Sequence, residues 1–120
     1  IVHGDDGLDE ITITGSTTIS ELKNYKINQY KISPKDFGLS NADFSEIAAQ
    51  TPEESLLLVR EAFAGEQSAI QDMIALNAGA GLYVARKTKS IADGIELAFD
   101  LMNSGKAADK LAAYVRVSNS

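Results

Sequence analysis

The sequence contains no cysteine and no tryptophan, and it has a single histidine, His3, among its 120 residues. Without cysteine the chain can form neither disulfide bonds nor a thiol nucleophile. This composition fits a reducing compartment, and we expect the cytoplasm. A zinc site, which is usually built from cysteine and histidine, is disfavoured for the same reason. Any metal bound here would be a hard cation held by oxygen atoms.

Basic clusters and long apolar runs are scarce as well. The net charge is −6, and the longest basic run is Arg86-Lys87. Nucleic acid binding needs a basic surface, so we expect no nucleic-acid partner. The longest weakly polar run, Met73 to Ala85, is too short to span a bilayer and contains Asn77, so we expect no membrane partner.

The amino terminus opens inside an apolar run, Ile1-Val2, without an initiator methionine or a signal peptide. We interpret the chain as a piece of a longer protein that starts within a strand. We expect that strand to be buried and parallel to its neighbours, with its carboxyl end leading into the acidic segment that follows. In open α/β sheets, ligands bind at such strand ends.

Three further strands are predicted in the first third of the chain. Residues 10–14, EITIT, alternate apolar and polar side chains and contain β-branched residues. Residues 17–23 and 26–32 flank Asn24-Tyr25, where asparagine tolerates the positive φ of a two-residue hairpin turn. Residues 33–39 contain Pro34 and Gly38 and are predicted to form a loop.

The rest of the chain has helical periodicity. We expect a short helix over residues 41–49, a helix beginning at Thr51-Pro52 and ending at Gly65, and a long, buried helix over residues 68–86. Two more are predicted from Ser90 to Gly105 and over residues 106–115. Small residues at 78–81 should let another element approach closely. The fold class is therefore α/β: a strand, an acidic loop, antiparallel strands and then a helical segment.

Four carboxylates crowd the acidic segment, namely Asp5, Asp6, Asp9 and Glu10. Taken alone, such a cluster favours a solvated surface turn. The spacing does not fit a calcium-binding EF-hand loop. Magnesium fits better, because it needs only one or two carboxylates together with water and phosphate oxygens.

The segment VHGDDGLDEITITGSTTISEL, residues 2–22, closely resembles the anthranilate phosphoribosyltransferases of tryptophan biosynthesis, whose characteristic segment reads V-H-G-x-D-G-L-D-E. The likeness continues over the whole chain, in YKISPKDFGL (30–39), TPEES (51–55), LNAGAGLYVA (76–85) and SGKA (104–107). Several segments in the right order make the resemblance specific.

The resemblance implies an enzyme that joins phosphoribosyl pyrophosphate to anthranilate, giving N-(5-phosphoribosyl)anthranilate and pyrophosphate. It implies that Asp9 and Glu10 bind Mg²⁺, and it assigns no catalytic residue within the chain. Residues 1–120 would form the C-terminal part of the α/β domain. The first part of that domain and an N-terminal helical domain, through which the family forms homodimers, would be missing. The family's glycine-rich pyrophosphate loop, G-T-G-G-D, does not occur here, so the chain alone should be inactive.

Three alternatives remain open at this point. The first is a pyrimidine nucleoside phosphorylase, which shares the fold, although the V-H-G-x-D-G-L-D-E segment is the transferase form. The second is a nucleic-acid-binding relative without transferase activity, which should be more basic and should alter Asp9-Glu10. The third is a structural domain whose acidic loop is simply solvated. His3 could serve as a general base, but a lone histidine at a strand end is more often packed or hydrogen-bonded.

Overall fold

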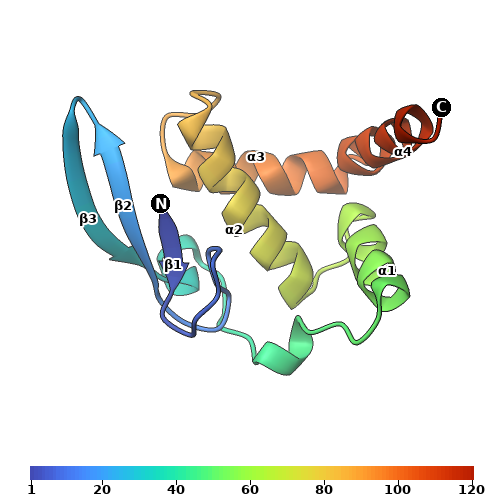
Figure 1. Ribbon diagram of the computed structural model, residues 1–120, viewed down its shortest axis with the longest axis horizontal. Coiled ribbons are helices and arrows are strands. Elements are labelled where there is room, and N and C mark those ends of the chain that lie inside the picture. Colours follow the sequence, from blue (N-terminus) through green and yellow to red (C-terminus); the bar gives the residue numbers. More distant parts are fainter. The chain divides into compact units, whose positions relative to one another are not determined.

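A computed structural model describes all residues from Ile1 to Ser120. The chain divides into two compact units. The sheet unit, residues 1–47, contains the strands, and the helical unit, residues 48–120, contains the four α-helices (Figure 1). None of these helices combines the length and the apolarity that crossing a membrane requires.

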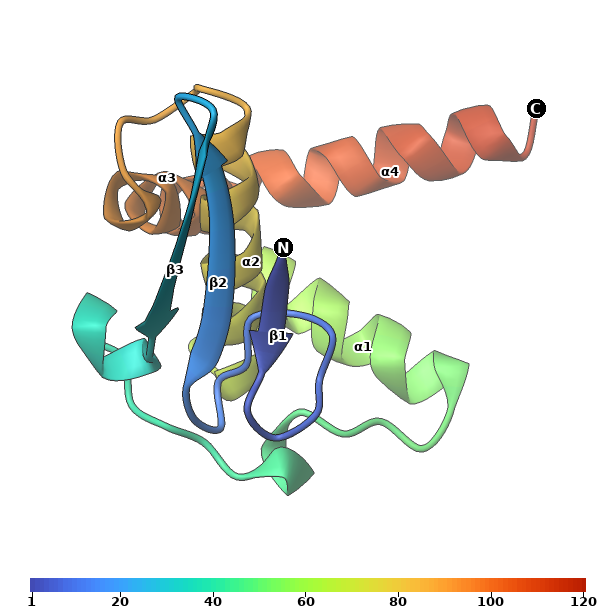
Figure 2. The same ribbon diagram turned by 60° about the vertical axis from the view of Figure 1, so that its left-hand side comes forward.

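The sheet unit is built on three antiparallel strands in the order β1-β2-β3 (Figure 2). They are β1 (Val2–Gly4), β2 (Thr17–Lys23) and β3 (Lys26–Ile32). The predicted hairpin is confirmed: β2 pairs with β3 from Thr17↔Ile32 to Lys23↔Lys26. Asn24 and Tyr25 have φ values of 51° and 62°, the left-handed pair that matches the twist of a two-residue hairpin.

Strand β1 differs from the prediction in direction and in burial. It pairs antiparallel with β2, with Val2 opposite Ile19 and Gly4 opposite Thr17, and it lies at the edge of the sheet. Ile1 and His3 are exposed, and Val2 is only half-buried. The prediction of a buried parallel strand is therefore wrong for the described sheet. The connection from β1 to β2 reverses the chain without a crossover element, so the neighbouring strand runs the opposite way.

Residues 10–14 form no strand, contrary to the prediction. Ile11, Thr12 and Ile13 are all buried, whereas a half-buried strand would alternate. Two backbone amides of this stretch bond to side chains instead of to a neighbouring strand. The Thr12 amide donates to Thr17 Oγ1 at 3.0 Å, and the Thr14 amide donates to Thr12 Oγ1 at 3.0 Å. Threonine hydroxyls compete with strand pairing in this way, and here they produce an ordered loop.

Residues 33–50 contain two short 3₁₀-helices, η1 (Pro34–Phe37) and η2 (Phe44–Glu46). The first replaces the predicted loop and ends at Gly38, whose φ is 74°. The second is all that forms of the helix predicted over residues 41–49. A helix cannot run from residue 41 through residue 43, because Asp43 has an extended backbone (φ −78°, ψ 151°) and η2 begins only after it.

The helical unit follows the predicted boundaries closely. Its helices are α1 (Pro52–Phe63), α2 (Ala69–Val84), α3 (Ile91–Asn103) and α4 (Lys106–Ser118). The hydroxyls of Thr51, Ser68 and Ser90 each cap a helix by accepting a backbone N–H three residues on, at 3.1 Å. Gly65 and Gly105 adopt positive φ just after α1 and α3. Helix α4 runs three residues beyond the predicted end.

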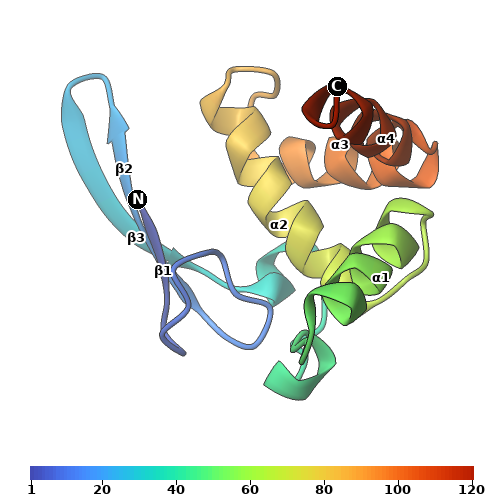
Figure 3. The ribbon, with the colours of Figure 1, turned by 45° about the vertical axis from the view of Figure 1, so that its right-hand side comes forward.

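Helices α2 and α3 pack against each other (Figure 3). Two glycines, Gly79 and Gly94, lie at the point of contact. A Cβ atom on Gly79 would lie 2.6 Å from the Ile95 amide nitrogen, and one on Gly94 would overlap the Gly79 carbonyl. The small residues of α2 therefore permit a close approach, as predicted. Helix α2 is not buried all round, however: Gly79 is buried, but Gly81 is exposed and Val84 is 78% exposed.

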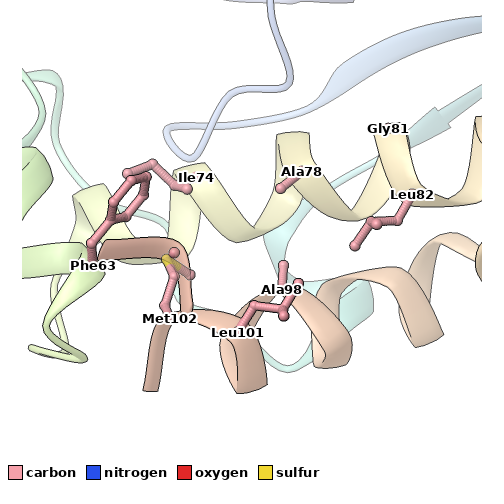
Figure 4. Close-up of a pocket in the computed structure, with 9 residues that line it drawn as sticks. Phe63, Ile74, Ala78, Gly81, Leu82, Ala98, Leu101 and Met102 are labelled. Carbon is pink, nitrogen blue, oxygen red and sulfur yellow. The ribbon is translucent and has the colours of Figure 1, made fainter. Parts of the chain in front are cut away.

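An apolar pocket of about 350 Å³ opens beside this crossing, lined by all four helices (Figure 4). Ile74 and Leu82 of α2 face it from one side, and Leu101 and Met102 of α3 from the other. Phe63 of α1 closes one end. The helical unit thus presents apolar side chains around an open hollow.

We expect Gly79→Ala to destabilise the protein by about 1–3 kcal/mol, because the added methyl group must push α2 and α3 apart. Gly81→Ala is the matched control: it lies in the same helix, and a Cβ there meets nothing within 4 Å. Alanine at that site should stabilise the helix by up to about 1 kcal/mol. Urea denaturation measures both, and equal effects of the two variants would contradict the close crossing.

Candidate functional site

The acidic loop, residues 5–16, connects β1 to β2 and is closed by its own backbone. The Asp5 amide donates to the Ser16 carbonyl at 2.8 Å, and the Gly4 amide donates to the Leu8 carbonyl at 2.8 Å. Gly7 has a φ of 99°, a value that favours glycine. Gly4 is buried, and a Cβ there would lie only 2.5 Å from Asp6 Oδ1. Both glycines therefore serve the geometry of the loop.

Asp6 is the most heavily hydrogen-bonded carboxylate of the loop. Its Oδ1 accepts from the Leu8 amide at 3.1 Å, and its Oδ2 accepts from Thr12 Oγ1 and Thr14 Oγ1, each at 2.5 Å. Partial burial raises the pKa of Asp6, but the hydrogen bonds from the two hydroxyls and from the backbone together outweigh this effect and hold the pKa below its usual value. Asp6 is thus a negatively charged structural group.

Asp5 is compensated by a basic residue of the sheet. Lys31 Nζ on β3 lies 2.6 Å from Asp5 Oδ2, and Thr18 Oγ1 on β2 donates to Asp5 Oδ1 at 3.4 Å. The hydrogen bond from Lys31 lowers the pKa of Asp5. Both partners are solvent-exposed, so the pair orients the loop more than it stabilises the fold. The charge of His3, which is exposed on β1, lowers the pKa of Asp5 by a smaller amount.

Asp9 and Glu10, the two residues predicted to bind Mg²⁺, are exposed and irregular in backbone conformation. They do not begin a strand, as the sequence suggested. Neither takes part in the hydrogen bonds and the ion pair that engage Asp5 and Asp6. Both carboxylates therefore present oxygen atoms to solvent. Their neighbours Asp5 and Asp6, by contrast, already have partners within the protein.

The carboxylates of Asp9 and Glu10 suit a hard cation that keeps some of its water ligands better than a metal ion bound entirely by protein side chains. Nowhere in the chain do three or more His, Cys, Asp or Glu side chains gather in an arrangement that could hold an ion. Two adjacent carboxylates suit Mg²⁺, which keeps several water molecules and takes further oxygens from a phosphorylated ligand. Asp9 and Glu10 are the residues of the loop that could bind it.

Sequence reasoning missed the role of Asp6 and of the two threonines that bond to it. The signal was present, since Thr12 and Thr14 follow a dense group of acids. Their alternation with Ile11 and Ile13, however, is typical of a strand.

Comparison with known proteins points to one enzyme family. A family model described as "Glycosyl transferase family, a/b domain" matches residues 1–108. The anthranilate phosphoribosyltransferase of Alkalilimnicola ehrlichii is 47% identical over 116 residues, which are 97% of this chain and 34% of that protein. These findings confirm the resemblance stated above.

Solved structures of such enzymes share the fold. The anthranilate phosphoribosyltransferase of Thermus thermophilus has a TM-score of 0.88 at 34% identity, and the match covers 99% of this chain and 35% of that enzyme. The Saccharomyces cerevisiae enzyme in complex with phosphoribosyl pyrophosphate and Mg has a TM-score of 0.85 at 27% identity, over 100% of this chain and 35% of its own. The α/β assignment is confirmed, and the chain spans about a third of the length of these relatives.

We expect Asp6→Asn to lower the free energy of unfolding at pH 7 by about 1 kcal/mol, a modest value because solvent screens the exposed carboxylate. The folded-state pKa of Asp6 lies below its unfolded value. Its stabilising contribution is therefore present above about pH 4 and is lost as the pH falls through the folded-state pKa. The difference between wild type and variant should shrink accordingly in urea denaturation between about pH 7 and about pH 3.

Asp9→Asn serves as the control for this experiment, since it removes the same charge from the same loop outside the hydrogen-bonded group. Its stability should stay within about 0.5 kcal/mol of the wild type. A stability difference for Asp6→Asn that is independent of pH would show that the Asp6 charge does not stabilise the loop.

Proposed function

The chain belongs to the glycosyl transferase family, in its a/b domain, and from this we propose that the complete protein transfers the phosphoribosyl group of phosphoribosyl pyrophosphate to anthranilate. The observation that carries the proposal is the likeness to anthranilate phosphoribosyltransferases along the whole chain, 47% identical over 116 residues. A related enzyme from Saccharomyces cerevisiae binds phosphoribosyl pyrophosphate and Mg, which supports the same substrate and metal here.

In the proposed reaction, the amino nitrogen of anthranilate forms a bond to C1 of the ribose while the bond from C1 to the pyrophosphate oxygen breaks. Pyrophosphate leaves with the electron pair, and the nitrogen gives up a proton. The products are N-(5-phosphoribosyl)anthranilate and pyrophosphate, a step of tryptophan biosynthesis. Negative charge grows on the leaving group, so the site must supply positive charge there.

The acidic loop can supply positive charge at the leaving group only if it binds a cation. Asp9 and Glu10 would hold Mg²⁺, which, when bound, would stabilise the negative charge on the pyrophosphate oxygens as a Lewis acid. At a net charge of −6 the chain would otherwise repel a polyanion. Lys31 pairs with Asp5, and the hydroxyls of Thr12 and Thr14 donate hydrogen bonds to Asp6, which leaves Asp9 and Glu10 as the available ligands.

We further propose that residues 1–120 form the C-terminal part of the α/β domain. The glycine-rich pyrophosphate loop and the anthranilate-binding groups would then lie in the rest of the protein. A homodimer through an N-terminal helical domain and a cytoplasmic location are parts of the same proposal. Of the alternatives considered above, the relatives' names favour the transferase over a phosphorylase, and the acidic charge disfavours nucleic acid binding.

We expect Asp9→Asn and Glu10→Gln in the complete protein to raise the Mg²⁺ concentration for half-maximal activity. The loss of one charged ligand is worth about 1–3 kcal/mol, or roughly a 5- to 150-fold increase. The loss of anthranilate fluorescence, followed at several Mg²⁺ concentrations, measures this change.

Glu96→Gln is the matched control, because Glu96 is an exposed acid of α3 and its neutralisation changes the net charge equally. Its Mg²⁺ dependence should equal that of the wild type. If Asp9→Asn also behaves like the wild type, the metal role of the acidic loop is wrong.

A further inference from the structure

We propose that Asp6 is a positioning residue that holds Asp9 and Glu10 in place by clamping the loop on both sides of them. The clamp consists of Asp6, Thr12 and Thr14, together with the backbone amide of Leu8. This role rests on the function proposed above, and it assigns Asp6 no contact with metal or substrate.

The partners of Asp6 lie on either side of Asp9 and Glu10 in the sequence. Asp6 Oδ1 accepts from the amide of Leu8, the residue immediately before Asp9. Asp6 Oδ2 accepts from the hydroxyl of Thr12, two residues after Glu10, and from that of Thr14. A single carboxylate thus ties together both ends of the short segment that carries the two candidate ligands.

The far side of the clamp is anchored in the core of the sheet unit. Thr12 has no exposed surface, and its amide donates to Thr17 Oγ1 at 3.0 Å. Thr17 lies at the start of β2 and is 1% exposed. The clamp therefore fixes the exposed ligand segment to the buried start of a regularly paired strand. Ligand-supporting groups of this kind orient the carboxylates of a site before the ligand arrives.

Gly4 supplies an independent observation, since the clamp closes directly over it. A Cβ atom there would lie 2.5 Å from Asp6 Oδ1, 3.2 Å from Thr12 Cγ2 and 3.3 Å from the Leu8 carbonyl. All three atoms belong to the clamp or to the segment that it holds. An alanine at this position would displace the Asp6 carboxylate without removing any polar group. Gly15, in the same loop, would meet nothing within 4 Å.

Binding is measured with the complete protein and phosphoribosyl pyrophosphate but without anthranilate, so that no turnover occurs. Calorimetric titration with Mg²⁺ should show roughly tenfold weaker binding for Gly4→Ala and for Asp6→Asn. Gly15→Ala should bind as the wild type does. Thr14→Val should weaken binding as well, whereas Thr14→Ser, which keeps the hydroxyl, should restore it. In steady-state assays the KM for anthranilate should be unchanged in all of these variants.

A double variant separates positioning from general loss of stability. If Asp6 acts through Asp9 and Glu10, Asp6→Asn/Asp9→Asn should weaken Mg²⁺ binding by less than the two single losses combined, because coupled effects do not add. Additive losses would overturn the positioning role. So would Mg²⁺ binding within about twofold of the wild type for both Gly4→Ala and Asp6→Asn while Asp9→Asn binds weakly. If Asp9→Asn itself binds normally, the proposed metal role fails and the positioning role fails with it.

Discussion

Like charges crowded into one loop are the constraint on which the sheet unit depends. Four carboxylates occur between Asp5 and Glu10, and in close proximity they repel one another unless partners or water intervene. The fold matches them individually: Lys31 approaches Asp5, and two hydroxyls and one amide surround Asp6. The remaining pair faces solvent. The same distribution of partners that makes the loop stable thus leaves two carboxylates available for a cation.

Both units have a glycine where neighbouring atoms approach the backbone too closely to leave room for a side chain. Gly4 lies beneath the hydrogen-bonded group of the acidic loop, and Gly79 lies where α2 meets α3. In each case the neighbouring atoms occupy the space that a side chain would need. The glycine of the loop brings polar groups within hydrogen-bond distance, whereas that of the helix lets apolar surfaces pack. Neither needs positive φ, so steric room rather than backbone freedom explains both.

In the proposed chemistry, the four acids of the loop have two different roles. Two acids are engaged in structure and two remain for binding, although nothing in their chemical type distinguishes them. A polyanionic substrate would be repelled by this acidic chain, so the proposed cation is required for charge balance as well as for catalysis. Family membership accounts for the fold, and in the proposed function the exposed pair would connect this chain to phosphoribosyl transfer.

Local signals in the sequence determined the parts of the structure that depend on neighbouring residues. Asn24-Tyr25 specified a hairpin turn, Thr51, Ser68 and Ser90 specified helix starts, and Gly65 and Gly105 specified helix ends, because caps and tight turns involve only a few adjacent residues. The resemblance of the whole chain to one enzyme family could also be recognised from the sequence alone.

Only the tertiary structure decided how residues 1–16 are arranged. The Ile-Thr alternation at 11–14 predicted a strand, but Thr12 and Thr14 bond to Asp6 and Thr17, partners up to eight residues away. The acids and the threonines lie close together in the sequence, but which of them pair depends on how the loop closes, and the consecutive burial of Ile11, Thr12 and Ile13 arises from packing. The sequence could therefore indicate which acids resemble metal ligands. Which acids the fold uses for its own stability depended on where loop closure brought the donors.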